Sequence, residues 1–169
     1  HCSNSAAILN FPEMNFDMVR AGLILYGHYP SAFVRSKIRL VPVMELKTVI
    51  SMVKKVPAGT PVSYSGTCVS DDERIIATVP IGYADGLKRQ LGNGNACFYV
   101  NGKAAPIIGN ICMDMCMIDL TDIECKENDT AILFDENHSI ERIAEACDTI
   151  AYEILTSISQ RVKRIYYHE

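Results

Sequence analysis

The first seven residues carry groups suited to binding an anion. This turn (HCSNSAA) is rich in hydroxyl and amide side chains and leads into an apolar stretch typical of a helix. Backbone N–H groups at the start of a helix, with a serine such as Ser5 beside them, bind phosphate well. Plain N-capping by Asn4 or Ser5 explains the same residues, so both interpretations stay open.

An arginine interrupts the apolar run MVRAGLILYG, which occupies residues 18–27. Such a run indicates a strand buried on both faces, as in a parallel α/β sheet. An unpaired buried charge is very costly, so Arg20 is expected either to pair with a carboxylate or to donate to a ligand. In an α/β barrel the phosphate site commonly lies in the loops after the last two strands, and Gly22 would allow a close backbone approach there.

Three later segments are richer in polar residues and glycine than packing alone requires. Tyr64 lies among small hydroxylic residues (VSYSGT), where it is either presented to a ligand or buried with its hydroxyl satisfied. Tyrosine has an ordinary pKa of about 10, so it is a poor base near neutrality unless a cation lowers that value. Residues 81–86 (IGYADG) and 109–114 (GNICMD) pair glycine with aspartate, which turn chemistry alone can explain.

The elements that must position these residues change character near residue 40. Before it, a short helix at residues 4–10 and the buried strand 18–27 indicate the last βα piece of an α/β (TIM-type) barrel, followed by a crossover at residues 28–37. After it, short strands separated by turns indicate an antiparallel, Greek-key-like β-barrel. We therefore predict a mainly β fold with domains at residues 1–40 and 41–169.

Within the second domain, the pattern predicts a series of strands and two short helices. Asn101-Gly102 is a strong signal for a type I′ hairpin, and Ser139 is a suitable cap for the first helix. The strands are expected at residues 43–56, 61–69, 74–81, 96–100, 105–108, 113–120, 130–134 and 161–167, and the helices at residues 139–147 and 150–157.

Composition excludes several classes of function. The net charge of −4 argues against nucleic acid as a partner, and no apolar run approaches the roughly 20 residues that span a bilayer. Seven dispersed cysteines indicate reduced thiols in a cytoplasmic protein. Cys112 and Cys116 would lie about 13 Å apart on one strand, so we expect no metal site. The opening HCSNSAA contains no signal peptide and no initiator Met, so we expect an excised piece of a longer chain.

Taken in order, these segments resemble one family. HCSNSAA, MVRAGLILYG, PAGTPVSYSGT, VPIGYADGLKR, GNICMDMCMIDL and AYEILTSISQRVKR resemble the second half of alanine racemases, which depend on pyridoxal 5′-phosphate (PLP). The resemblance implies an isomerase that interconverts L- and D-alanine for peptidoglycan synthesis. It also implies a PLP-binding α/β barrel, a C-terminal β domain and a head-to-tail homodimer, with residues 1–40 at the end of the barrel.

The resemblance assigns the N-terminal residues to the cofactor. Ser5, Gly22 and Leu23 match positions that bind the PLP phosphate, the last two through backbone N–H groups, and Asn4 lies beside them. Arg20 matches the arginine that faces the pyridine nitrogen. A guanidinium does not give up its proton, so it would leave that nitrogen unprotonated and the ring a weaker electron sink.

The resemblance assigns later residues to the substrate. Tyr64 matches the second catalytic base, which acts across the dimer interface from the face opposite the cofactor lysine. Met113 matches a residue whose backbone N–H contacts the substrate carboxylate, and Tyr83 and Asp85 match the wall of the entrance channel. Gln160 matches a substrate- or phosphate-side position. The cofactor lysine itself lies upstream of His1 in the family, so we expect this chain alone to be inactive.

Two departures from the family pattern keep other hypotheses open. Asn110 stands where many members have arginine, and Gln160 stands where some have tyrosine and serine-preferring relatives have an amide. A serine racemase-like variant is therefore one alternative. A non-catalytic β-barrel binding module is another, which predicts that Arg20 pairs with a carboxylate and that Tyr64 is buried. The ending RVKRIYYHE also resembles racemases fused behind a peptidoglycan-precursor ligase.

Overall fold

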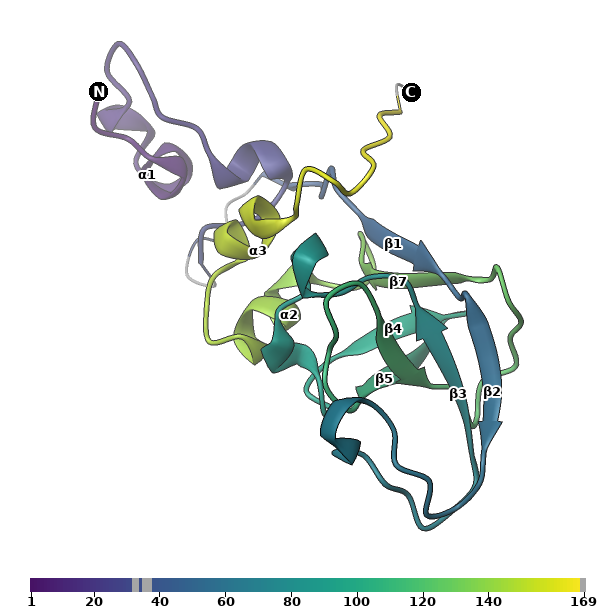
Figure 1. Cartoon of the computed structure of the whole chain (residues 1–169). Coiled ribbons are helices and arrows are strands. Elements are labelled where there is room, and N and C mark those ends of the chain that lie inside the picture. The colour runs from purple at the N-terminus through teal and green to yellow at the C-terminus, as the bar shows by residue number, and fades with distance from the viewer. Residues whose placement is uncertain (32–33, 35–37, 168–169) are drawn as a thin grey trace. The chain divides into compact units, whose positions relative to one another are not determined.

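The computed structural model describes residues 1–31, 34 and 38–167, and the chain divides into two compact units. Unit 1 comprises residues 1–45 and unit 2 residues 46–169 (Figure 1). Residues 32–33 and 35–37 of the predicted crossover at residues 28–37 lie outside the described residues.

Unit 1 begins with the predicted short helix. Helix α1 spans Ser5–Asn10, and its N-cap Asn4 accepts a hydrogen bond from the Ala7 N–H through its side chain, at 3.1 Å. This bond satisfies one of the backbone donors that a helix start leaves unpaired, so the capping interpretation of Asn4 is confirmed. Two 3₁₀ turns follow, Pro12–Met14 and Leu23–Tyr26.

The predicted buried strand at residues 18–27 was wrong. Within the described residues of unit 1 the only strand-like pairing is one parallel bridge between Asn4 and Arg20. After this bridge the backbone hydrogen bonds are local, with the Leu25 N–H donating to the Gly22 carbonyl. The side chains of Met18 and Leu25 are exposed rather than buried. A strand needs ladder partners along its length, and an apolar run alone does not separate a strand from a short helical turn.

Unit 2 is built on one curled, seven-stranded antiparallel sheet (Figure 1). Its strand order is β1-β7-β4-β5-β6-β3-β2. The strands are β1 Leu46–Val49, β2 Met52–Val56, β3 Arg74–Val79, β4 Cys97–Val100, β5 Lys103–Ile108, β6 Cys116–Asp119 and β7 Thr130–Phe134. The mainly β fold class is confirmed.

Strands β1 and β2 are consecutive in sequence but lie at opposite ends of the strand order. Because the short link between them must join the two ends, the sheet curls. The change of partner occurs at a buried residue, Ile50, whose N–H donates to the Asp129 carbonyl of the β7 side. The next N–H, that of Ser51, donates to the Thr78 carbonyl of β3. The single strand predicted for residues 43–56 was therefore wrong, since its alternation of side chains gave no sign of a change of partner.

Several local predictions are confirmed. Asn101 and Gly102 have φ angles of 49° and 76°, as a type I′ turn requires, and they join β4 to β5. The strands predicted at residues 74–81, 96–100, 105–108 and 130–134 all form within a few residues. In β4 and β6 buried and less buried residues alternate, with Phe98 and Ile118 fully enclosed in the core.

The two predicted helices also form. Helix α2 spans Ile140–Ala146 and is capped by the Ser139 hydroxyl, which accepts from the Glu141 N–H. Helix α3 spans Ala151–Ser157 and buries Ile154 and Leu155. Ile150 is the exposed N-cap of α3 rather than part of it. The strand predicted at residues 161–167 was wrong, since none of these described residues lies in a strand.

Candidate functional site

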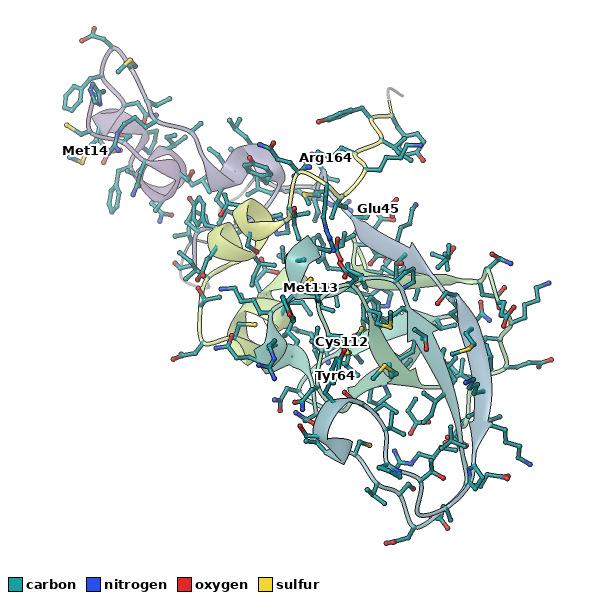
Figure 2. The ribbon with its side chains drawn as sticks, in the orientation of Figure 1. Met14, Glu45, Tyr64, Cys112, Met113 and Arg164 are labelled. Atoms are coloured by element: carbon teal, nitrogen blue, oxygen red, sulfur yellow. The ribbon has the colours of Figure 1, made fainter. Side chains whose placement is uncertain are left out.

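Three loops of unit 2 carry the predicted substrate-side residues and are hydrogen-bonded to one another. They follow β2 (residues 57–73), β3 (residues 80–96) and β5 (residues 109–115). Figure 2 shows Tyr64, Cys112 and Met113, which belong to two of these loops. Two of the strand predictions were too long for this reason: residues 61–69 form only a Val62–Cys68 bridge, and β6 begins at Cys116 rather than at Met113.

Tyr64 lies at the tip of the first loop, in a 3₁₀ turn spanning Tyr64–Gly66, and 71% of its surface is exposed. The turn is held against the third loop at two points. The Ser63 hydroxyl donates to the Asn110 carbonyl at 2.7 Å, and the Asn110 side-chain amide donates to the Tyr64 carbonyl at 3.1 Å. The backbone of Tyr64 is thus fixed while its ring is presented outward, contrary to the buried tyrosine that a binding module predicts.

Met113 lies in the third loop, and its peptide unit is oriented by the second loop. The Cys112 carbonyl accepts from the Tyr83 N–H, and the Met113 carbonyl accepts from the Ala84 N–H, both at 3.0 Å. The Cys112 carbonyl and the Met113 N–H share one trans peptide, in which they point in opposite directions. The Met113 N–H is therefore turned away from the second loop and held in that direction.

The second and third loops approach each other so closely at Gly82 that residue 82 cannot carry a side chain. A Cβ at this position would lie 2.3 Å from the Met113 carbonyl oxygen and 2.4 Å from that of Cys112. The glycine of the IGYADG motif thus has a packing role beyond turn formation. This close approach links the predicted channel-wall residue Tyr83 to the predicted carboxylate contact at Met113.

Asp85 ends the 3₁₀ turn Tyr83–Asp85 of the second loop. It forms an ion pair with Arg161 that was not predicted from the sequence. Its Oδ2 accepts from the Gly82 N–H at 2.8 Å, and its Oδ1 accepts from Arg161 Nε at 2.7 Å. Arg161 Nη2 also donates to Asp114 Oδ1 at 2.5 Å. Burial raises the pKa of Asp85, but the hydrogen bonds from Arg161 and Gly82 and the Arg161 charge outweigh it and lower that pKa below its ordinary value.

Arg161 directly follows the predicted substrate-side residue Gln160, which is exposed. The Ser159 N–H donates to the Asp85 carbonyl at 3.0 Å, so this segment is held against the second loop by backbone as well as by side chain. The two carboxylates raise the pKa of Arg161. No local sequence signal connects Arg161 with its partners, because Asp85 is 76 positions and Asp114 47 positions away.

In unit 1, the predicted phosphate-side residues Ser5 and Gly22 come together. The buried Ser5 hydroxyl accepts a hydrogen bond from the Gly22 N–H at 3.0 Å. The next residue, Leu23, is also buried. Arg20 is exposed rather than buried, because its segment is not an internal strand. Its guanidinium donates to the Cys2 carbonyl at 3.3 Å, and within the described part of the chain no carboxylate pairs with it, contrary to the binding-module alternative.

The cysteines make no disulfide among the residues that the structure describes. Burial, with a smaller effect of nearby Cys112, raises the pKa of Cys116 to about 12, so that thiol stays protonated near neutrality. In the same residues no three potential ligands gather as a metal site would require. None of the described helices has the length and apolar character needed to cross a membrane.

Comparison with known proteins places this arrangement in one family. The family model for the alanine racemase C-terminal domain matches residues 43–166, and that for the N-terminal domain matches residues 1–30. The alanine racemase of Clostridium novyi is 47% identical over 98% of this chain and 44% of its own length, and that of Methanococcus maripaludis is 46% identical over 99% of this chain and 46% of its own. This chain therefore spans less than half the length of these relatives.

Solved structures of alanine racemases share the fold of this chain. The alanine racemase of Clostridium difficile 630 superposes with a TM-score of 0.92 at 45% identity, covering 98% of this chain and 44% of that one. The enzyme of Bartonella henselae, with covalently bound pyridoxal phosphate, gives a TM-score of 0.90 at 35% identity, covering 98% of this chain and 46% of that one. From the matching family models, the identities and the shared fold together, this chain belongs to the alanine racemase family.

Proposed function

We propose that the full-length protein containing this chain is a PLP-dependent racemase that interconverts L- and D-alanine. The observation that carries the proposal is the joining of the Tyr64 and Met113 loops through Ser63 and Asn110, in a chain of this family. Tyr64 presents an ionisable hydroxyl, and Met113 an oriented backbone N–H, on hydrogen-bonded loops. D-Alanine made in this way would serve peptidoglycan synthesis in the cytoplasm.

Tyr64 is proposed as the base that exchanges the Cα proton of L-alanine. Racemisation by two bases needs one proton-transferring group on each face of Cα, and the partner group is the cofactor lysine of the barrel domain. The exposure of Tyr64 suits a residue that acts at the site of a second subunit in a homodimer. Asn110 and Ser63 would hold its backbone so that the hydroxyl reaches a fixed point.

The residues of unit 1 fit the PLP phosphate. The Ser5 hydroxyl uses its oxygen to accept from Gly22, so its own proton remains available to a phosphate oxygen. The family resemblance adds the N–H groups of Gly22 and Leu23 as phosphate donors, and the Gly22 N–H, which donates to Ser5 in this structure, would be shared with the phosphate. Arg20 would donate to the pyridine nitrogen, and residues 1–40 would form the end of the cofactor barrel, with residues 41–169 as the β domain.

When bound, PLP supplies an electron sink for the negative charge left on Cα. The Met113 N–H would bind the substrate carboxylate. Tyr83 and Asp85 would form the wall of the channel through which alanine enters. Asn4 would support the phosphate-side turn through its cap of α1.

The experiment that tests this function compares the full-length protein with the isolated chain of residues 1–169. With PLP, the full-length protein is expected to convert L-alanine to D-alanine. The isolated chain is expected to show no turnover and no lysine adduct trapped by borohydride, because the family's cofactor lysine lies upstream. The measurements are chiral chromatography and mass spectrometry. A specific trapped lysine within residues 1–169 together with turnover, or an inactive full-length protein, would overturn the proposal.

A serine-racemising variant is the second candidate, because Gln160 is exposed next to the Arg161 ion pairs. A carboxamide both donates and accepts, so it suits a hydroxyl-bearing substrate. One added hydrogen bond is worth about 0.5–1.5 kcal/mol, a preference of roughly tenfold at most. We therefore expect alanine as the main substrate, with measurable serine racemisation that falls when Gln160 becomes Tyr.

The measurement is kcat/KM for both amino acids in the full-length protein and in Gln160→Tyr. Asn137→Tyr, which alters an exposed amide in the turn between β7 and α2, is the control and should leave the ratio unchanged. A parent that prefers serine would refute the choice of alanine. An unchanged ratio in Gln160→Tyr would remove Gln160 from substrate selection.

A further inference from the structure

We propose that Arg161 is a positioning residue that holds the Met113 peptide and Gln160 in a fixed relation, so that the substrate carboxylate meets a preset backbone N–H. The inference rests on the proposed function and adds to it a residue that has no role in the sequence-based predictions. Its basis is the bridge from one guanidinium to two carboxylates, Asp85 Oδ1 at 2.7 Å and Asp114 Oδ1 at 2.5 Å.

Two routes lead from Arg161 to the same peptide unit. The direct route runs through Asp114, the residue after Met113. The indirect route runs through Asp85, whose second oxygen accepts from the Gly82 N–H and so fixes the turn that donates to the Cys112 and Met113 carbonyls. Because both routes end at the residues flanking the Met113 N–H, loss of Arg161 releases that group from two sides.

The segment that carries Arg161 is itself anchored. Arg164 (labelled in Figure 2) donates through Nη2 to the Ile158 carbonyl at 3.1 Å and through Nη1 to the Ser159 carbonyl at 3.3 Å. The Ser159 N–H in turn donates to the Asp85 carbonyl. Gln160 lies between these anchored residues, so its position depends on the same contacts that set the Met113 peptide.

The bridge needs an arginine. The guanidinium offers donors in a planar fork, and here Nε and Nη2 point to different carboxylates. A lysine ammonium is a point charge on a flexible chain and would retain the charge without fixing the angle between the two loops. Arg161→Lys is therefore expected to rescue only part of the function that Arg161→Gln loses.

The expected kinetic signature is a rise in KM. A backbone N–H that contacts the substrate carboxylate binds the ground state and the transition state alike, so its displacement weakens both. In the full-length protein, Arg161→Gln should raise KM for both alanine enantiomers about tenfold, while kcat changes less than about threefold. Propionate, which has the carboxylate and lacks the amino group, should bind about tenfold more weakly by calorimetry.

The matched control is Arg74→Gln. Arg74 also pairs with an aspartate, Asp119, at 2.8 Å, and its side chain is 36% exposed against 46% for Arg161. This variant removes the same charge and the same type of ion pair from strands β3 and β6. It should lower the melting temperature while leaving KM and propionate affinity unchanged, which separates positioning from a general loss of stability.

A double-mutant cycle completes the test. Asp85→Asn and Arg161→Gln should each raise KM, and together they should raise it by less than the product of the two effects, because they break one network. If Arg161→Gln does not fold, Arg161→Lys and Asp114→Asn are measured in its place; both should raise KM, Arg161→Lys by less than tenfold because lysine retains the charge. An active wild-type protein whose Arg161 variants keep both KM and propionate affinity would overturn the positioning role alone. An inactive wild-type protein would overturn the proposed function.

Discussion

The Tyr64→Phe variant of the full-length protein is expected to racemise alanine about 10²- to 10⁴-fold more slowly, with its fold and PLP absorbance retained. The change removes one hydroxyl from a ring that is mostly exposed in unit 2, so it removes no core packing. The backbone contacts of this turn, from Ser63 and Asn110, do not involve the hydroxyl. A large loss of rate would thus come from lost proton transfer rather than from a displaced loop.

A hydrogen-exchange measurement identifies which face of Cα the hydroxyl serves. The two enantiomers of alanine have equal free energy, so kcat/KM must fall equally in both directions. Exchange of the Cα proton with D₂O is free of this constraint. In Tyr64→Phe it should be lost for L-alanine and largely kept for D-alanine, which the lysine face would serve. Tyr166→Phe, at a tyrosine that is 79% exposed, is the control. A rate loss below tenfold would exclude Tyr64 as a catalytic base.

Gly82→Ala is expected to have the second largest effect. Its methyl group would lie 2.3 Å from the Met113 carbonyl oxygen, far inside van der Waals contact, so the 109–115 loop must move. The φ angle of Gly82, −142°, is one that alanine adopts freely, so the effect is steric. A displacement approaching 1 Å at a substrate-binding peptide lowers kcat/KM by about 10²-fold. Overpacking of this kind also lowers the free energy of unfolding by about 1–3 kcal/mol.

The control for this variant is Gly59→Ala, where no atom lies within 4 Å of the new methyl group but φ is +75°. It carries a backbone cost of about 1–2 kcal/mol and no clash, so it should lose stability and keep full kcat/KM. Chemical denaturation and steady-state kinetics on both variants separate the two effects. If Gly82→Ala retained wild-type kcat/KM, the close contact of the two loops would not contribute to substrate binding.

The sequence by itself determined the features that depend on neighbouring residues. Asn101-Gly102 forms its hairpin because both residues tolerate positive φ. Asn4 and Ser139 cap their helices because a short polar side chain reaches an N–H two or three positions ahead. The order of motifs likewise indicated the alanine racemase family, and the family models confirm it.

Only the tertiary structure decided the features that depend on distant partners. The apolar runs around Arg20 and Ile50 gave no sign of which strands would pair with them. Unit 1 therefore has a single bridge where a strand was predicted, and unit 2 changes partner at Ile50. The Arg161 bridge joins carboxylates 47 and 76 positions away. Periodicity and capping depend on contacts within a few residues, whereas ion pairs and strand neighbours are fixed only when the sheet curls and brings its loops together.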